Sequence, residues 1–392
     1  MARSGPKSFA RSFPPRITIM LSMLAGNAVA FAPQSMLSQS RVSQSRVSAM
    51  EMKQNPVIIG VAADSGCGKS TFMRRLTSIF GGESKMLDIG RETNTLISEM
   101  TTVICLDDYH KWDRTGRASN PEYPDGITAL DEKCQDWDKM AADVTDLKAG
   151  KTVSKPIYNH ITGELDPYEE VPATPIVIFE GLHPLYDSRV NAALDLSIYL
   201  DITDEVKFAW KAQRDIAERG ATMEDVQKAI DARKPDFKAY VEPQKEKADI
   251  VIQVLMSDVV PDGSGKFLKV KFIQRKDCAA LESAYLMDEG STISWTPNAA
   301  KLASEVGVKL ASYSEDWFGH EVDVVEMDGA VDKLEEIIYL ESQMCNTGTK
   351  FYGELTEQIV KNKDAPGSDN GTGLMQTLCS FKIREVYEKL TK

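Results

Sequence analysis

Cysteine, histidine and long apolar runs are scarce in this chain. Six cysteines and four histidines are spread over 392 residues, and so few cysteines exclude the dense disulfide framework of a small secreted domain. There is no apolar run of about 20 residues, the length that a membrane-spanning helix needs, so we expect no membrane segment. Glycine, proline and charged residues occur at ordinary frequencies, which excludes collagen-like and disordered chains.

Acidic residues are absent from residues 1–50, which carry six Lys and Arg. An apolar stretch at 17–30 follows four of these basic residues and ends in Ala28-Val29-Ala30, the layout of a signal peptide, with a buried N-terminal helix as the alternative. Residues 31–50 are rich in Ser and Arg, as a transit peptide is. A signal peptide at 1–30 before a transit peptide at 31–50 resembles the bipartite presequence of algae with complex plastids. It predicts a chloroplast stroma location.

The rest of the chain is strongly acidic. Without residues 1–50 it holds 40 Lys and Arg against 59 Asp and Glu, a net charge of −19. Nucleic-acid binders show a basic face, so we expect no nucleic-acid partner. Any phosphate site must then be a local positive pocket in a negative surface.

Apolar runs alternate with helix-like segments after residue 55. The runs at 56–63, 101–108, 175–181, 194–201 and 248–255 suit buried parallel strands, and segments 130–149, 204–219 and 222–233 suit helices. This alternation predicts an α/β fold with a mixed, mostly parallel sheet flanked by helices. We expect one domain over 51–392. A C-terminal β/α extension should start near 265, with a strand at 266–273 and helices at 330–361 and 373–390.

A glycine-rich turn joins the first run to a helix-like stretch. Its sequence meets the phosphate-loop pattern G-x-x-x-x-G-K-S except at the first position, where Ala63 stands. The backbone N–H groups of such a loop bind ATP phosphates, with Lys69 reaching the β- and γ-phosphates and the Ser70 hydroxyl ligating Mg²⁺. The predicted ATP-binding residues are Asp64, Ser65, Gly66, Cys67, Gly68, Lys69, Ser70 and Thr71.

Two further runs end in acidic residues. Ligands bind at the carboxyl ends of parallel strands, where Asp107 could serve as a general base and Glu180 could face a Mg²⁺ ion. His110, Arg114 and Arg117 could hold an anionic co-substrate, and a solvated charged loop is the alternative.

A predicted helix carries a stripe of charge. Lys211, Arg214, Asp215 and Arg219 share one face by their spacing. The stripe could neutralise charge in a phosphoryl-transfer transition state, or it could be an exposed ion-paired face.

These elements together resemble the plant and cyanobacterial phosphoribulokinases. The resemblance spans residues 55–392 and rests on motifs that include AADSGCGKSTF, VICLDDYH, RTGR, KPIYNH, EVKFAWK, ARKPDF and DEGSTISW. It implies a P-loop kinase related to uridine kinases that uses ATP and Mg²⁺ to phosphorylate the C1 hydroxyl of ribulose 5-phosphate. It further implies a homodimer that thioredoxin reduces. A uridine kinase or other small-molecule kinase, and a non-catalytic nucleotide-binding scaffold, are the alternatives.

The resemblance also implies roles for single residues. Asp107 would be the catalytic base, and Lys69, Lys211, Arg214 and Asp215 would complete the catalytic set. Glu180 and Ser70 would face the metal. The implied sugar-phosphate binders are His110, Arg114, Arg117, Tyr158, His160 and Arg219.

Cysteines bear on regulation. A disulfide between Cys67 in the loop and Cys105 before Asp107 would distort the site, and the resemblance suggests such a light-dependent switch; two inert buried thiols are the alternative. Plant-type relatives carry a second cysteine pair where this chain has Asn298 and Ser304. Its loss argues against the family's inhibited complex with glyceraldehyde-3-phosphate dehydrogenase and a small linker protein.

Extra residues at 119–125 also lengthen the loop after Arg117.

Overall fold

The computed structural model describes residues 55–80, 96–124, 126–219, 222–281, 286–287, 290, 292–295, 306–331 and 333–392. Backbone contacts divide the chain into Met1–Met50 and Glu51–Lys392, and all described residues belong to the second unit. The predicted signal and transit peptides lie outside the described residues. In the part of the chain that is described, no helix is both long and apolar enough to cross a membrane.

A mixed sheet forms the centre of the second unit, with ten strands among the described residues, in the order β10-β11-β12-β9-β8-β7-β1-β6-β3-β2. The run β8-β7-β1-β6-β3 is parallel, and the strands outside it pair antiparallel. All residues of β1 and β6 are buried, as parallel strands covered on both faces must be. The strands are β1 (Val57–Ala63), β2 (Leu96–Ile97), β3 (Thr101–Cys105), β6 (Ile176–Gly181), β7 (Leu196–Ile202), β8 (Ile250–Met256), β9 (Leu268–Arg275), β10 (Thr292–Trp295), β11 (Val308–Trp317) and β12 (His320–Gly329).

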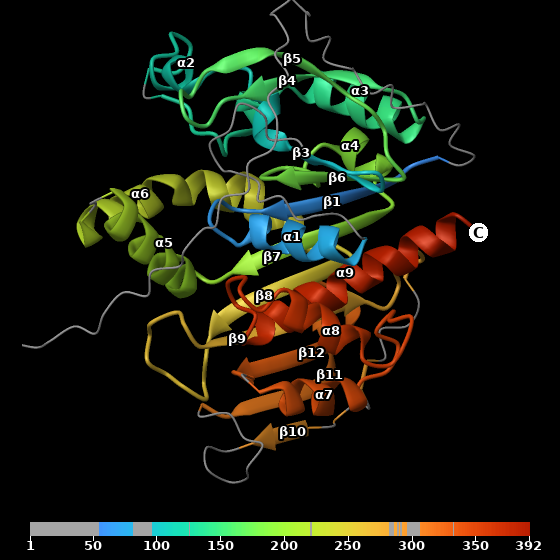
Figure 1. Cartoon of the computed structure of the whole chain (residues 1–392). Coiled ribbons are helices and arrows are strands. Elements are labelled where there is room, and N and C mark those ends of the chain that lie inside the picture. The colour runs from blue at the N-terminus through green and yellow to red at the C-terminus, as the bar shows by residue number, and fades with distance from the viewer. Residues whose placement is uncertain are drawn as a thin grey trace, which may run out of the picture. The chain divides into compact units, whose positions relative to one another are not determined.

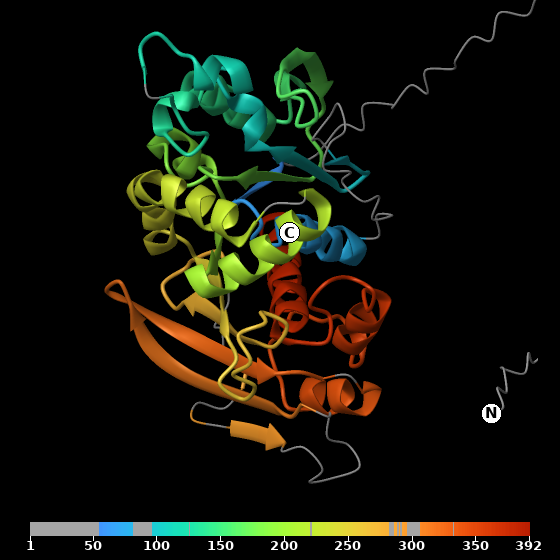
Figure 2. The same cartoon turned by 90° about the vertical axis from the view of Figure 1, so that its left-hand side faces the viewer.

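Helices cover both faces of this sheet, so the predicted α/β fold is confirmed. Helices α1 and α9 lie on one face (Figures 1 and 2), and α3 packs on the other against β1, β3 and β6. The smaller helix α8 packs against both α9 and α7. These helices are α1 (Lys69–Ile79), α3 (Trp137–Lys148), α4 (Ser188–Ala193), α7 (Leu334–Ser342), α8 (Glu354–Lys361) and α9 (Gly371–Leu390).

Some predicted boundaries differ from the structure. The helix expected over 130–149 starts only at Trp137, because the Asp136 side chain accepts from the backbone N–H of Lys139 and caps it. The helix expected over 330–361 is two helices, and Gly353, with φ of 97°, precedes the second. The predicted strand 101–108 ends at Cys105 and continues as a 3₁₀ helix, η1 (Leu106–Tyr109).

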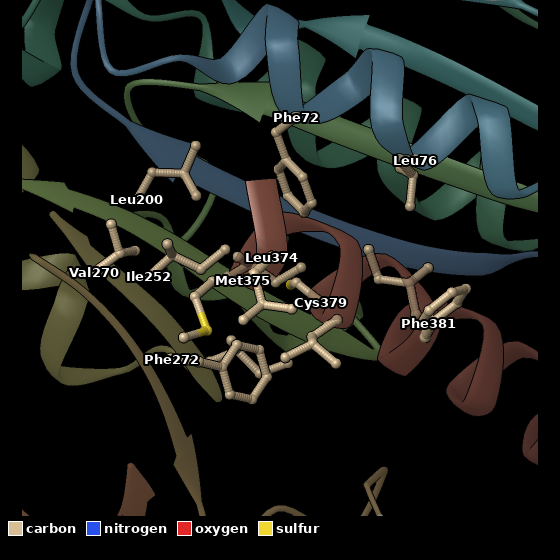
Figure 3. Close-up of a cluster of buried hydrophobic side chains, with 14 of the residues drawn as sticks. Phe72, Leu76, Leu200, Ile252, Val270, Phe272, Leu374, Met375, Cys379 and Phe381 are labelled. Atoms are coloured by element: carbon tan, nitrogen blue, oxygen red, sulfur yellow. The ribbon is translucent and has the colours of Figure 1, made fainter. Parts of the chain in front are cut away.

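The largest core cluster joins the phosphate-loop helix to the C-terminal helix. Figure 3 shows Phe72 and Leu76 of α1 in one cluster with Met375 and Phe381 of α9 and with side chains of strands β7 to β9. A buried polar contact ties the same two helices, because the Arg75 guanidinium donates to the Gln376 side chain and to Ser368 Oγ. The C-terminal helix therefore supports the helix that presents the phosphate loop.

Two smaller structures lie beside the main sheet near the carboxyl ends of its parallel strands (Figure 1). One is a separate hairpin of β4 (Val153–Tyr158) and β5 (Leu165–Val171). The other is a helical pair, α5 (Asp204–Arg219) and α6 (Met223–Asp236), where Thr222 and Asp225 form a capping box at the start of α6. A short helix, α2 (Arg114–Ala118), lies near the hairpin tip.

Candidate active site

The loop between β1 and α1 has the conformation of an anion-binding turn. Gly66 and Gly68 have φ values of 83° and 78°, left-handed conformations that glycine adopts without strain. Gly68 caps α1, so the first N–H groups of that helix face outward with the positive end of its dipole. Such a helix start binds phosphate.

A cavity of about 620 Å³ opens at this loop, next to the ends of β3 and β6. It gathers residues from several segments that are far apart in the chain. The loop contributes Asp64, Ser65, Gly66, Gly68, Lys69 and Ser70, whereas Cys67 is buried beneath and Thr71 does not line the cavity. The other predicted residues that line it are Cys105, Asp107, His110, Arg114, Arg117, Tyr158, His160, Glu180 and Lys211.

Lys69 is held over the loop and stays protonated. Its Nζ donates to the carbonyl oxygens of Ala63 at 3.4 Å and Asp64 at 3.1 Å. Burial by itself would lower the Lys69 pKa, but the nearby Glu180 and Asp107 carboxylates reverse this and raise it. The ammonium is therefore a fixed positive charge beside the candidate phosphate site.

Asp107 lies in η1, just past the end of β3. The turn points the side chain into the cavity, where it is 29% exposed and its Oδ2 lies 3.7 Å from His160 Nε2. Burial would raise its pKa, but His110, His160 and Lys69 outweigh that effect and lower it. Asp107 is therefore an ionised carboxylate at neutral pH, as a proton acceptor must be.

Glu180 lies near the end of β6, the strand between β1 and β3. It is buried, and its Oε2 has no hydrogen-bond partner among the described residues. Burial and Asp107 raise its pKa, and Lys69 opposes them. A buried carboxylate oxygen without a partner lowers the stability of the fold, so Glu180 is suited to ligate a cation.

The oxygens around Lys69 suit magnesium. Mg²⁺ binds carboxylate and hydroxyl oxygens, which Glu180, Asp107 and Ser70 offer at one cavity. Ligand atoms of Cys105, Asp107 and His160 also lie within 4.8 Å of one another. Sulfur and imidazole nitrogen suit softer metals than Mg²⁺, so the oxygen set is the better candidate.

A cationic wall faces Asp107 from α2 and the hairpin. The Arg117 guanidinium contacts His110 Nδ1 and donates to the Tyr158 hydroxyl, both at 2.9 Å. Arg114 Nη2 donates to the backbone oxygen of His160 at 2.9 Å. Burial lowers the pKa of His110 to about 4, so the positive charge of this wall at neutral pH comes from the arginines.

Two cations at the loop were not predicted from the sequence. Lys207 Nζ of α5 lies 3.0 Å from Asp64 Oδ2, and Arg233 Nη2 of α6 lies 3.3 Å from Asp64 Oδ1. Both side chains line the cavity, and Lys207 also lies 4.0 Å above the Phe237 ring. The four-residue spacing of Lys207 and Lys211 could have placed them on one helical face.

The predicted charge stripe is described only in part. Lys211 lines the cavity. Arg214, Asp215 and Arg219 lie on α5 by their backbone, but their side chains lie outside the described residues. Their roles stay a prediction.

The two cysteines of the predicted switch are free, buried thiols. Strand β6 lies between β1 and β3, and Cys105 is in register with Glu180, which is in register with Val61. Neighbouring strands are about 4.8 Å apart, so the Cys105 backbone is about 10 Å from β1. Burial raises the pKa of Cys67 to about 12 and that of Cys105 well above its usual value. Asn298 and Ser304 lie outside the described residues.

Comparisons with known proteins identify the family of this chain. The family model described as "Phosphoribulokinase / Uridine kinase family" matches residues 58–261. The chain is 55% identical to the chloroplastic phosphoribulokinase of Chlamydomonas reinhardtii, over 87% of this chain and 90% of that protein. It is 50% identical to the phosphoribulokinase of Synechocystis sp., over 86% of this chain and 95% of that protein.

Uridine kinases are more distant. The uridine kinase of Latilactobacillus sakei is 27% identical over 51% of this chain and 86% of that protein. The high identity along nearly the full length of the phosphoribulokinases, together with the phosphate loop, shows the family. The chain belongs to the phosphoribulokinase/uridine kinase family.

Proposed function

We propose that this protein transfers the γ-phosphoryl group of ATP to the C1 hydroxyl of ribulose 5-phosphate and so forms ribulose 1,5-bisphosphate. The observation that carries the proposal is the identity of 50–55% to phosphoribulokinases from algae, plants and cyanobacteria over most of their length. The reaction is a step of the Calvin cycle. The algal and plant relatives are named chloroplastic, which supports a chloroplast location.

The residues of the cavity support a direct transfer. The carboxylate of Asp107 accepts the proton of the C1 hydroxyl as its oxygen attacks the γ-phosphorus in line. Lys69 and the N–H groups at the start of α1 hold the phosphates and stabilise the charge that develops on them. Arg114 and Arg117 bind the sugar phosphate, because guanidinium groups form charge-assisted bonds to phosphate.

Magnesium bound by Glu180 and Ser70 would supply further neutralisation of the ATP phosphates. Lys211, Arg214 and Asp215 of α5 would complete the catalytic set, and Arg219 would contact the sugar phosphate. A homodimer and reduction by thioredoxin are part of this proposal, and so is import through a bipartite presequence. The absence of a second cysteine pair argues against a regulated complex with glyceraldehyde-3-phosphate dehydrogenase.

The test is an assay of the purified protein with ATP and Mg²⁺ that couples ADP formation to NADH oxidation. Ribulose 5-phosphate should stimulate ADP formation and uridine should not. Stimulation by uridine alone would favour a nucleoside kinase. ATP binding without either activity would favour a non-catalytic scaffold.

A further inference from the structure

The hairpin of β4 and β5 carries part of the cationic wall that faces Asp107, but its strands do not belong to the main sheet. Its tip brings Tyr158 and His160 to the cavity. At its far end, Val153 and Val171 are in register and pack in the core cluster that contains α3. Apolar packing therefore fixes the far end, and polar contacts hold the end beside the cavity.

A further polar contact involves a buried lysine on β4. Lys155 Nζ lies 2.5 Å from Asp108 Oδ2 and 3.0 Å from Glu169 Oε1. The side chains of Lys155 and Asp108 are both 0% exposed, whereas that of Glu169 is 26% exposed. The hairpin register shifts between Lys155 and Ile157, and such a bulge redirects side chains near active sites.

Asp108 connects the hairpin to the candidate catalytic turn. Its Oδ1 accepts the backbone N–H of Tyr158 at 2.8 Å, while its Oδ2 receives Lys155. Asp108 follows Asp107 in the four-residue turn η1. One carboxylate thus holds the hairpin at two points and belongs to the same short turn as the candidate base.

Stability alone is a weak reason for this pair. Replacing a buried ion pair with apolar side chains often leaves a protein as stable or more stable. Hydrogen bonds to a charged group do fix geometry more tightly than apolar contacts. A displacement of about 1 Å at a reacting group can lower the rate about 100-fold.

We propose that Asp108 and Lys155 are positioning residues that fix the position of Tyr158 and the cationic wall relative to Asp107. This inference rests on the proposed function. Neither side chain lines the cavity among the described residues, so they act through Tyr158 and η1.

The matched test compares Asp108→Asn with Glu169→Gln. Each removes one carboxylate from the same lysine and leaves the other, so Lys155 keeps an ionic partner in both. Asp108→Asn should lower kcat/KM for ribulose 5-phosphate about 10- to 100-fold, with KM for ATP within twofold of wild type. Glu169→Gln should stay within twofold for both substrates.

The outcomes are separable. No activity of the wild type with ribulose 5-phosphate would remove the proposed function itself. With an active wild type, normal kcat/KM in Asp108→Asn, an equal loss in Glu169→Gln, or an equal rise in KM for ATP would overturn the inference. If Asp108→Asn does not fold, the double variant Asp108→Asn/Lys155→Met, which leaves no unpaired buried charge on these two residues, is measured under the same criteria.

Discussion

Asp107 Oδ2 lies 3.7 Å from Nε2 of His160, and both residues line the cavity. The two residues come from different structures, η1 and the tip of the β4–β5 hairpin. Together with Lys69 and the cationic wall, the His160 imidazole helps to keep the pKa of Asp107 below its usual value. The candidate base is therefore ionised well below neutral pH.

Replacing Asp107 should impair chemistry far more than ATP binding. Asp107→Asn keeps the side-chain shape but cannot accept the substrate proton, so kcat should fall about 10²- to 10⁴-fold. KM for ATP should change only a few-fold, since the phosphate loop is intact. Steady-state kinetics with both substrates measures this. A variant that keeps more than about a tenth of wild-type kcat would exclude Asp107 as the base.

Arg114 should act on the sugar phosphate. Arg114→Ala removes a guanidinium that lines the cavity and donates to His160 O, so KM for ribulose 5-phosphate should rise about tenfold or more. Arg219→Ala should act in the same direction. Arg189→Ala removes an exposed arginine paired with Asp138 and Asp187 and is the control. A rise in KM for ATP alone would show that the arginine assignment is wrong.

Lys207 should contribute to ATP binding. Its ammonium lies between Asp64 and the Phe237 ring at the phosphate loop, so Lys207→Met should raise KM for ATP about tenfold and leave KM for ribulose 5-phosphate nearly unchanged. Lys228→Met removes an exposed pair with Glu224 on α6 and should change neither. If Lys207→Met also changes neither, the contact with Asp64 is structural only.

Buried histidines should make stability depend on pH. His183 is buried, and burial lowers its pKa from 6.5 to about 4. The folded protein then binds fewer protons than the unfolded chain between these values, so the free energy of unfolding rises with pH across that window. The contribution of His183 to this free energy is lost as the pH falls from 6.5 towards 4.

The change in the free energy of unfolding with pH across this window tests the role of His183. Urea unfolding at pH 7.5 and 5 should show a smaller loss in His183→Phe than in the wild type, since phenylalanine cannot take up the proton. Tyr186→Phe keeps a ring next to His183 and removes a hydroxyl whose pKa burial raises above its usual value of 10.0, so this variant should keep the wild-type loss. Equal losses in all three proteins would contradict the prediction.

Oxidation should inactivate the enzyme through Cys67 and Cys105. A disulfide needs Cα atoms within about 7 Å, and β6 separates the strands that lead to the two residues, so the bond would move the phosphate loop or η1. Because burial raises both thiol pKa values, few thiolates form and oxidation should be slow at neutral pH.

Activity and free thiols followed together test this switch. Cys67→Ser and Cys105→Ser should each abolish the reversible loss of activity, and Cys278→Ser should not. An oxidised wild type that stays active, or a Cys105→Ser variant that is still inactivated and rescued by a dithiol, would disprove the switch.

The sequence by itself determined the phosphate loop, the parallel strands and the acids at their ends. Each of these is a local pattern: a continuous apolar run specifies a strand buried on both faces, and the residues after it must lie at the same sheet edge. Sequence patterns placed Asp107 at this edge but extended its strand too far, because an apolar run does not distinguish a strand from the 3₁₀ turn that follows it.

Only the tertiary structure decided which charges meet. Asp64 contacts Lys207 and Arg233, which are 143 and 169 residues away, and Asp108 meets Lys155 across 47 residues. Spacing along the chain carries no information on such pairs, since long side chains reach their partners only after the sheet, the hairpin and the α5–α6 pair have packed. The loop was therefore evident from its own residues, whereas the ion pairs that hold the site together were not.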